Sequence, residues 1–396
     1  MNIKKIIGRD RDLFIDDIAC HEREISDAIK GSRVLLYGGA GSIGREVAAH
    51  IFKRSPAALH VMDISENNLV ELVRDLRSSI GYTDGETQFL PIDMGSIEAQ
   101  AFLAEQGPYD YVLNLAAMKH VRSEKDAYSL MRMIKVNILD TLSTLEHAQR
   151  IKATKYFAVS TDKAKNPANL MGATKRIMED VLFRSDATLV STARFANVAF
   201  SDGSLLHGFR QRLARRQPLS APRAIRRYFV TGPESGYLCL ASLILGNHRQ
   251  IFFPNLDASL ELLTFSEIAV RFLETEGYEP VMMDSEDEAR SRVEELAAAK
   301  RWPCYFFDSD TSGEKPFEEF FSKEDTIDWT RFKDIGVINT PALTGAEETR
   351  LAAFLDTVHN LREQGRWQKS DLINAIYAAC PDLEHIDTGR FLDNRM

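Results

Sequence analysis

Two side chains that can exchange protons stand next to each other in the stretch VSTDKAKNPANLMGATKR, residues 159–176. A lysine that serves as a base needs a lowered pKa, and an aspartic acid that donates a proton needs a raised one. The mutual attraction of Asp162 and Lys163 opposes both shifts, so other charges of the same pocket must contribute. The alternative is a surface ion pair that contributes little. The pair therefore indicates acid–base chemistry, provided that the fold places it in a pocket.

The elements around this pair decide where it lies. A strand expected over 155–161 ends just before Asp162, and doubly wound sheets bind ligands at the carboxyl ends of their strands. A helix expected over 170–184 carries Met171 and, one turn later, Lys175 on the same face. A thioether cannot take a proton, so Met171 cannot act as a base.

Strands and helices alternate over residues 33–195. Short apolar runs predict strands at 33–38, 58–63, 88–93, 109–117, 155–161 and 188–195, and helical periodicity predicts helices at 42–54, 65–79, 131–150 and 170–184. This alternation predicts an α/β protein with a Rossmann-like doubly wound parallel sheet. We expect a helical lead-in over 1–30, the Rossmann domain over 31–196, a smaller α/β substrate-binding region over 197–340 and a helical C-terminal tail over 341–396.

A glycine-rich loop, YGGAGSIGRE, follows the first strand and opens the first helix. Its glycines allow a tight turn and close approach of the backbone to a pyrophosphate at the helix N-terminus. Asp63 ends the second strand about 20 residues on, where its carboxylate can accept hydrogen bonds from both ribose hydroxyls and would repel a 2′-phosphate. The loop therefore predicts NAD as cofactor, bound by Gly38, Gly41, Ser42, Ile43, Gly44 and Asp63.

The ends of the next two strands offer weaker signals. Asp93 ends the third strand, where it could meet the adenine amine, although a turn aspartate is an alternative. Ala116 and Ala117 follow the fourth strand and are small enough for the cofactor to lie against the backbone, or they simply pack in the core. Lys119 and His120 are candidate substrate contacts, with solvated loop charges as the alternative.

Composition excludes several classes of function. The 396 residues carry a net charge of −9, which argues against a non-specific nucleic-acid binder. No run approaches the roughly 18 apolar residues of a membrane span, and the N-terminus MNIKKIIGRDRDLF has no apolar core of a signal peptide, so we expect a cytoplasmic protein. The four cysteines and nine histidines show no metal-ligand spacing, and we expect no metal site.

Six motifs occur in a fixed order over residues 33 to about 320: GGAGSIG, MDISENNL, NLAAMKHV, VSTDKAKNPANLMGATKR, RRYFVT and GEKPFEEF. Together they resemble the polysaccharide-biosynthesis (CapD-like) branch of nucleotide-sugar 4,6-dehydratases, which are extended short-chain dehydrogenases. The segments YSLMRMIKVN and ARFANVAFSDGSL are most similar to those of the dehydratases of legionaminic-acid pathways, which act on GDP- or UDP-linked N-acetylglucosamine. Many short-chain dehydrogenases carry Tyr-x-x-x-Lys, and some members of this branch have methionine in place of the tyrosine, as at Met171.

The resemblance implies a reaction in three steps. NAD takes a hydride from sugar C4, water is eliminated across C5 and C6, and the hydride returns to C6. By the same resemblance Asp162 is the acid at the C6 oxygen, Lys163 is the base at C5 and Lys175 holds the nicotinamide ribose. The proton of the C4 hydroxyl must leave without a tyrosine, through Thr161 or through a water molecule.

Further residues are expected at the substrate. Asn197 should contact the sugar or its diphosphate, and Arg226 and Arg227 are candidates for the diphosphate because guanidinium groups match phosphate oxygens. A basic cluster without that role is the alternative for the two arginines. Lys119, His120 and Met171 complete the expected substrate contacts. Relatives often have an arginine just before GEK, which DTSGEK lacks, and residues 280–310 and 340–396 match the pattern poorly.

Three readings remain open from the sequence. The first is the dehydratase, and the second is a dehydratase that inverts C5 or a nucleotide-sugar epimerase. The third is a non-catalytic module that binds NAD, which Met171 suggests and the intact STDK motif opposes. The long helices that begin near Met131 and Met171 resemble those that pair subunits in this fold, so at least a dimer is expected.

Overall fold

The computed structural model describes residues 2–255, 262–308 and 319–385. Its large sheet contains β1 Arg33–Tyr37, β2 Ala58–Met62, β3 Glu86–Leu90, β4 Tyr111–Asn114, β5 Lys155–Thr161, β6 Leu189–Phe195, β11 Gln250–Pro254, β15 Thr326–Asp328 and β16 Ile335–Asn339. The order is β15-β16-β11-β6-β5-β4-β1-β2-β3, with β16 antiparallel to β11 and β15 antiparallel to β16. All six predicted strands lie in this sheet and run parallel.

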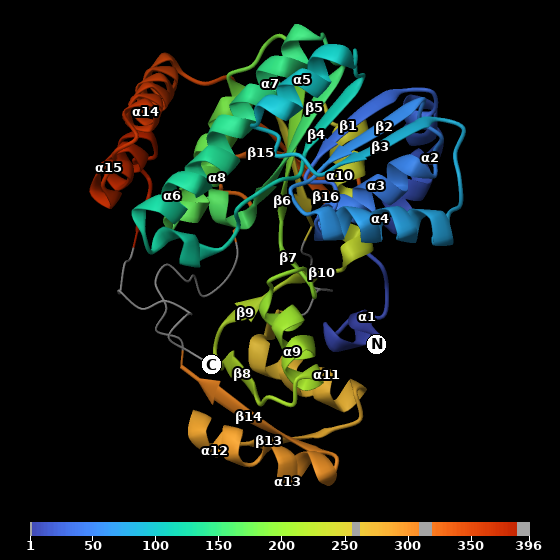
Figure 1. Cartoon of the computed structure of the whole chain (residues 1–396), viewed down its shortest axis with the longest axis vertical. Helices are drawn as coiled ribbons and strands as arrows, with labels where there is room; N and C mark the ends of the chain where they lie inside the picture. Colours follow the sequence, from blue (N-terminus) through green and yellow to red (C-terminus); the bar gives the residue numbers. More distant parts are fainter. Residues whose placement is uncertain (1, 256–261, 309–318, 386–396) are drawn as a thin grey trace.

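Helices cover both faces of the large sheet (Figure 1). One face carries α2 Ile15–Ile29, α3 Ser42–Phe52, α4 Glu66–Ser79 and α10 Gly232–Leu245. The other carries α5 Ile97–Glu105, α6 Ala127–Ile134, α7 Asp140–Arg150 and α8 Leu170–Phe183. The predicted helix over 131–150 is continuous through a π-helical segment, η2 Lys135–Leu139. The predicted fold class, a doubly wound parallel sheet, is confirmed.

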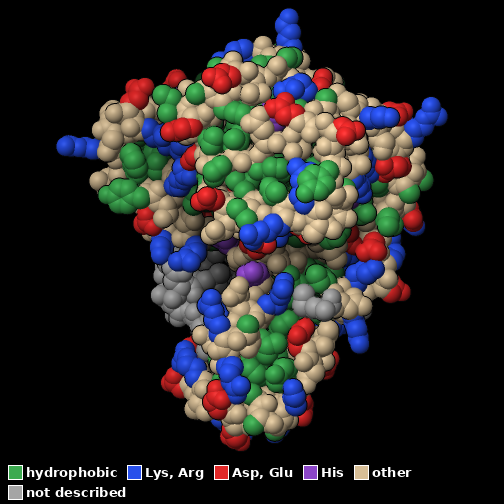
Figure 2. Space-filling model, turned by 45° about the vertical axis from the view of Figure 1, so that its right-hand side comes forward, with side chains coloured by type: hydrophobic (Ala, Val, Ile, Leu, Met, Phe, Trp, Pro, Cys, Tyr) green, Lys and Arg blue, Asp and Glu red, His purple; other side chains and the backbone are tan. Residues whose placement is uncertain are grey.

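A smaller lobe has its own hydrophobic core, which includes Phe209, Phe272 and Trp302. It contains the parallel strands β8 Leu219–Pro222, β14 Arg301–Phe307 and β13 Glu279–Met282 and the helices α1 Ile3–Ile6, α9 Leu205–Ala214, α11 Phe265–Thr275, α12 Glu286–Ser291 and α13 Val293–Ala298. Two further short pairs are β7 Asn197–Val198 with β10 Phe229–Val230, at the junction of the lobes in Figure 1, and β9 Arg226–Arg227 with β12 Leu263–Thr264, in the smaller lobe. Figure 2 shows the surface hollowed where the lobes meet, with basic side chains along the junction.

The sequence predicts that the Rossmann domain ends at residue 196. In the structure, later segments of the chain return to the large sheet. Helix α10 packs against α3, and β11 pairs with β6 in the large sheet. The sequence of β11, QIFFP, is buried throughout, which suits an interior strand covered on both faces. The region 197–340 is therefore shared between the two lobes. Residues 313–318 of the GEKPFEEF motif lie outside the described residues.

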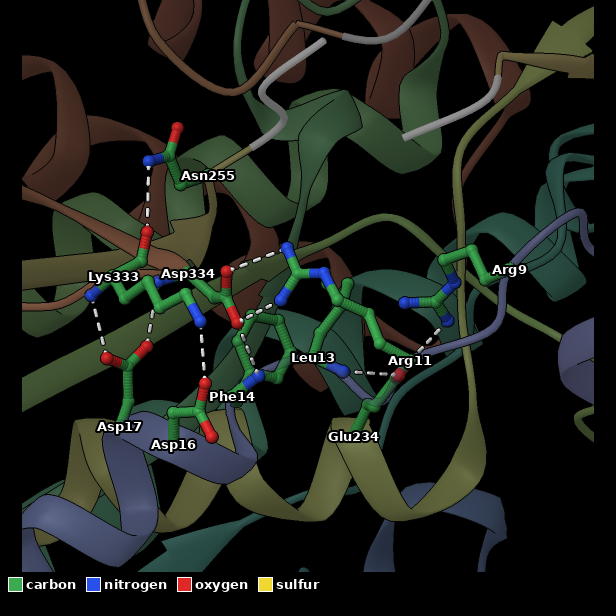
Figure 3. Close-up of polar contacts among 10 residues, drawn as sticks. All are labelled: Arg9, Arg11, Leu13, Phe14, Asp16, Asp17, Glu234, Asn255, Lys333 and Asp334. Atoms are coloured by element: carbon green, nitrogen blue, oxygen red, sulfur yellow. Dashed lines mark hydrogen bonds and ion pairs between the residues drawn. The ribbon is translucent and has the colours of Figure 1, made fainter. Parts of the chain in front are cut away.

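The N-terminal segment joins the two lobes through charge pairs (Figure 3). Ile6 and Ile7 lie in the core of the smaller lobe. Arg9 then binds the buried Glu234 at 2.6 Å, and Arg11 binds Asp334 through two hydrogen bonds of 2.8 and 3.0 Å. Glu234 lies in α10 and Asp334 directly precedes β16, both in the large lobe, so the expected lead-in joins one lobe to the other.

The C-terminal helices α14 Gly345–Gln364 and α15 Lys369–Ala379 pack on the outer side of α6 and α8 (Figure 1). Their buried apolar residues, Leu351, Phe354, Leu355, Val358, Leu372 and Ile376, extend the large core. The expectation of a dimer rests on the helices that begin near Met131 and Met171, and the tail packs on α8 and on α6, which contains the start of the first of these helices. Across the described residues, no helix combines the length and apolar character needed to cross a membrane.

Candidate functional site

The glycine loop between β1 and α3 is packed tightly against the end of β4. Gly38 has φ +69°, and a Cβ built there would lie 2.5 Å from the backbone nitrogen of Ala116. A Cβ at Gly44 would lie 2.2 Å from the carbonyl oxygen of Gly38. Only glycine fits these two positions, so the predicted loop has the compact form that lets a phosphate approach the backbone.

The first turn of α3 has no side-chain cap, and its Ser42 hydroxyl donates to Asp202 Oδ2 at 2.9 Å. Its N-cap residue is Gly41, which gives no side-chain cap, and a Cβ at Gly41 would meet only the Gly38 carbonyl oxygen, at 3.5 Å. Ser42 and Ile43 follow in this turn, so their backbone N–H groups belong to the positive end of the helix dipole. These residues fit a pyrophosphate, as the sequence predicts.

Asp63 lies directly after β2 and faces this loop. Its Oδ2 accepts a hydrogen bond from the Ala40 N–H at 3.0 Å, and its Oδ1 accepts one from the Ser65 N–H at 2.9 Å. The partly exposed carboxylate keeps lone pairs for further donors, because each oxygen can accept two hydrogen bonds. The geometry suits ribose hydroxyls and also ties the glycine loop to β2.

Asp93 is engaged by other side chains. Its Oδ2 accepts a hydrogen bond from Arg132 at 3.1 Å, Lys135 Nζ lies 3.6 Å from its Oδ1, and the Gly95 N–H donates to the same oxygen at 2.9 Å. Burial acts to raise the pKa of Asp93, but this N–H and the two cations lower it overall. The carboxylate therefore orders the turn after β3, which is the alternative role considered from the sequence.

Asp162 and Lys163 lie at the carboxyl end of β5, as the sequence predicts. Lys163 Nζ is 3.2 and 3.3 Å from the two carboxylate oxygens of Asp162, and the Thr161 hydroxyl donates to Asp162 Oδ1 at 2.7 Å. Asp162 is 5% exposed, whereas the Lys163 side chain is 29% exposed. A buried carboxylate beside a half-buried amine differs from the exposed pair that was the alternative.

A fully buried ion pair lies behind this motif. Arg194 on β6 donates to both oxygens of Glu179 on α8, at 2.9 and 2.7 Å, and donates to the Phe320 carbonyl at 2.6 Å. The Ser160 hydroxyl donates to Glu179 Oε1 at 2.6 Å. Ser160 is two residues before Asp162, so the pair fixes the strand end that carries the motif. We did not expect this pair, although an acidic residue inside the apolar run RIMEDVLF is a signal for it.

Lys175 lies inside the large lobe, and its ammonium donates to the Val159 carbonyl oxygen at 2.9 Å. Burial lowers its pKa to about 8, and the nearby Glu179 carboxylate opposes the shift. The hydrogen bond holds the side chain against β5, which ends just before Asp162.

The lowered pKa of Lys175 predicts a pH dependence of stability. The unfolded chain keeps this lysine protonated up to pH 10.5, whereas the folded chain releases the proton above about pH 8. The destabilising effect of a buried charge is therefore present below pH 8 and is relieved between pH 8 and 10.5. Urea unfolding should show wild type gaining stability relative to Lys175→Met over this range. A constant difference between the two proteins would contradict the shift.

Met171 lies in the first turn of α8 with its side chain buried in the large core, at 3% exposure, which differs from the substrate contact that the sequence predicts. The backbone around it is closely packed: a Cβ at Gly172 would lie 2.4 Å from the carbonyl oxygen of Lys163. Gly172 thus allows α8 to start against the turn that carries Asp162 and Lys163.

Gly172→Ala should therefore displace Lys163 and lower any activity that depends on it. Because the added methyl group meets backbone, we expect overpacking to cost about 1–3 kcal/mol of unfolding free energy. Gly345→Ala is the matched control, since Gly345 also lies in the first turn of a helix and a Cβ added there would meet nothing within 4 Å. Equal unfolding free energies for the two variants would argue against the close contact.

Asn137 is a site residue that sequence reasoning missed. It lies in η2, where its Oδ1 accepts from the Met118 N–H at 2.9 Å and its Nδ2 donates to the Met118 carbonyl and the Thr174 hydroxyl, both at 3.0 Å. The side chain thereby joins the loop after β4 to α8. A buried amide in the apolar run VNIL is the signal that could have found it.

The expected substrate residues come together in part. Lys119 Nζ lies 3.4 Å from the Ser201 hydroxyl, and a Cβ at Gly203 would lie 2.7 Å from His120 Nε2, so the loop after β4 meets the loop after β7. Asn197 lies in β7, which enters the latter loop, and its N–H donates to the Tyr228 carbonyl at 3.2 Å.

The two arginines of β9 are not equivalent. They are adjacent in a strand, so their side chains leave it in opposite directions. Arg226 is exposed, whereas Arg227 is buried and donates to the Arg226 carbonyl at 2.7 Å. The strand therefore cannot present both guanidinium groups to one diphosphate in the same way.

Comparisons with solved structures agree with this architecture. The protein is similar to Pen from Bacillus thuringiensis, with a TM-score of 0.64 and 21% identity over 79% of this chain and 89% of that one. It is also similar to the dTDP-glucose 4,6-dehydratase DesIV of Streptomyces venezuelae, solved with NAD bound, with a TM-score of 0.55 and 17% identity over 86% of this chain and 99% of that one. At these identities the likeness establishes the fold.

Three relatives cover much of the sequence. An uncharacterised membrane protein of Methanocaldococcus jannaschii is 27% identical over 83% of this chain and 92% of its own length. The capsular polysaccharide biosynthesis protein CapD of Staphylococcus aureus is 29% identical over 68% of this chain, which spans only 45% of CapD. An inverting UDP-N-acetylglucosamine 4,6-dehydratase of Campylobacter jejuni is 28% identical over 58% of this chain and 68% of its own. A family model described as polysaccharide biosynthesis protein matches residues 34–340, and the chain belongs to this family.

Proposed function

We propose that this protein is an NAD-dependent 4,6-dehydratase of GDP- or UDP-linked N-acetylglucosamine, and that its product feeds synthesis of surface sugars related to legionaminic acid. The buried Asp162 in contact with Lys163 at the end of β5 is the observation that carries the proposal. Elimination of water across C5 and C6 needs one group that donates a proton and another that accepts one. Support comes from the dehydratases among the relatives and similar structures.

The cofactor would lie across the carboxyl ends of β1, β2 and β4. The first turn of α3 would bind its pyrophosphate and Asp63 its adenosine ribose, and Ala116 and Ala117 would lie against it. Lys175 would hold the nicotinamide ribose. When bound, NAD supplies an acceptor for the C4 hydride and returns that hydride to C6.

The hydroxyl of Thr161 offers a route for the C4 proton that does not need a tyrosine. Thr161 already hydrogen-bonds Asp162, so it can pass the C4 hydroxyl proton to this carboxylate as C4 is oxidised to a ketone. Asp162 is then protonated, which is the state that it needs as an acid at the C6 oxygen.

Lys163 in its neutral form would remove the C5 proton, which the C4 ketone has made acidic. The C6 hydroxyl leaves as water with the proton from Asp162, and a double bond forms between C5 and C6. The hydride is added at C6 and Lys163 returns its proton to C5. The protons balance: the water that leaves carries the former C4 hydroxyl proton, and both side chains regain their starting states.

The face of C5 to which Lys163 returns the proton decides between retention and inversion. An enzyme that inverts C5 would use the same residues, whereas a 4-epimerase would return the hydride to C4 and needs no acid at C6. The Asp162–Lys163 pair therefore favours a dehydratase over a 4-epimerase.

Mass spectrometry of the purified protein with NAD tests the proposal. The protein is incubated separately with UDP-N-acetylglucosamine and GDP-N-acetylglucosamine, and the loss of one water from either sugar nucleotide is the expected result. An unchanged mass with both nucleotides would contradict it. Bound NAD without any product would then favour the non-catalytic module, and an unchanged mass with an altered sugar would favour an epimerase.

A further inference from the structure

The chain returns to the candidate site after its last described helix. Beyond α15, Cys380 and Leu383 are buried in the large core, and the Glu384 N–H donates to the carbonyl oxygen of Pro167 at 3.0 Å. Pro167 lies between the acid–base pair and the start of α8. Residues 380–385 therefore touch the connection between two parts of the site, although they lie outside the region 34–340 that the family model matches.

A buried pair of titratable side chains lies at this contact. His385 Nε2 is 3.5 Å from Glu124 Oε2, and the two side chains are 8% and 4% exposed. Glu124 ends a short 3-10 helix, Val121–Glu124, that follows Lys119 and His120. A carboxylate so deeply buried needs partners for its charge, and His385 is a partner that comes from 261 residues further along the chain.

The second oxygen of Glu124 holds the first turn of α8. Glu124 Oε1 accepts a hydrogen bond from the Met171 N–H at 2.7 Å, and the Asn169 side chain accepts one from the Gly172 N–H at 2.8 Å. Two side chains therefore take up free N–H groups of this turn, one of them anionic and favoured by the helix dipole. Because Gly172 is packed against the Lys163 carbonyl, a shift of this turn would move Lys163.

We infer that Glu124 and His385 are positioning residues: residues 380–385 clamp the start of α8, so that Lys163 and Lys175 keep the places that the reaction requires. The inference rests on the proposed function for its effect on catalysis. Neither side chain needs to touch the substrate, because Glu124 acts through the Met171 N–H and His385 acts through Glu124.

The test compares His385→Ala and His385→Gln with wild type in the full chain. His359→Ala is the matched control, because His359 is exposed on α14. Hydrogen exchange is followed by mass spectrometry on peptides covering residues 161–175. Loss of the clamp should speed exchange in the first turn of α8 by about tenfold or more in His385→Ala, with no change in the control.

Turnover gives a second and independent readout. His385→Ala should lower kcat for water loss by about 10- to 100-fold, with KM and NAD content close to wild type, because misplacement of Lys163 affects the chemical step. Glutamine can still donate to Glu124, so His385→Gln should recover most of the exchange protection and of kcat.

Exchange in His385→Ala that matches wild type would overturn the inference, and so would His385→Gln being as impaired as alanine. If wild type releases no water from either sugar nucleotide, the proposed function fails. The exchange comparison still decides whether the clamp holds α8 in that case.

Discussion

Replacing Lys163 with methionine should lower the rate of water loss by about 10²–10⁴-fold, because the base at C5 is removed while the length of the side chain is nearly kept. Asp162→Asn should have an effect of similar size, since an amide keeps a contact with Thr161 but cannot donate an acidic proton. Both variants should still bind NAD, because the proposed contacts with its pyrophosphate and adenosine ribose come from the glycine loop and Asp63. The measurement is the initial rate of product formation by mass spectrometry.

Lys30→Met provides the control for the loss of a positive charge, since Lys30 is exposed at the end of α2. It should leave the rate unchanged. A rate within tenfold of wild type in both Lys163→Met and Asp162→Asn would show that the acid–base chemistry lies elsewhere.

Glu179→Gln should lower the free energy of unfolding by about 3–5 kcal/mol, because it leaves the Arg194 guanidinium charged and buried without its partner. The two side chains are 1% and 3% exposed, so water cannot replace the lost charge. Although burial acts to raise the pKa of Glu179, Arg194 lowers it overall, and the group is a carboxylate at neutral pH. Urea unfolding of the cofactor-free protein measures the effect.

Glu294→Gln is the matched control for this pair. Glu294 binds Arg216 at 2.6 Å, but these side chains are 77% and 56% exposed, and such pairs contribute about 0–1 kcal/mol. Equal losses of stability in Glu179→Gln and Glu294→Gln would show that the buried pair has no special role behind the STDK motif.

The nucleotide-binding half was predictable because its signals are local. Most of the strands β1 to β6 are short apolar runs, although β3 reads ETQFL over Glu86–Leu90 where the sequence predicts a strand at 88–93. The glycines of the loop are required by close contacts inside the β1–α3 turn or with the end of β4. The STDK motif could be placed at a strand end for the same reason. These features depend on period and on turn chemistry, which a single sequence displays.

The rest depends on contacts between distant segments. The strand β14 reads RWPCYFF, and the proline inside it argues against a strand, although β14 pairs with β8 more than 80 residues earlier. Arg9 reaches Glu234, and His385 reaches Glu124, across most of the chain. Neither contact has a local sequence pattern. The sequence therefore could not indicate that the N-terminal segment binds α10 or that the C-terminal residues bind Glu124.

For Met171, the sequence and the structure answer different parts of the question of which group replaces the tyrosine. Its residue type excluded a tyrosine mechanism, but its burial in the core could not be read from the spacing of Met171 and Lys175. The structure adds the Thr161–Asp162 hydrogen bond, through which the C4 proton would pass in the proposed mechanism. In the proposed mechanism, the tyrosine position can therefore be apolar, because elimination would use Asp162 and Lys163.

The most direct test uses sugar nucleotide that carries deuterium at C4, with UDP- or GDP-linked N-acetylglucosamine as substrate and NAD present. The account predicts a product that has lost one water and holds the deuterium at C6, observed by mass spectrometry and NMR. Deuterium that remains at C4 of a sugar of unchanged mass, with the C4 configuration altered, would contradict it and identify an epimerase.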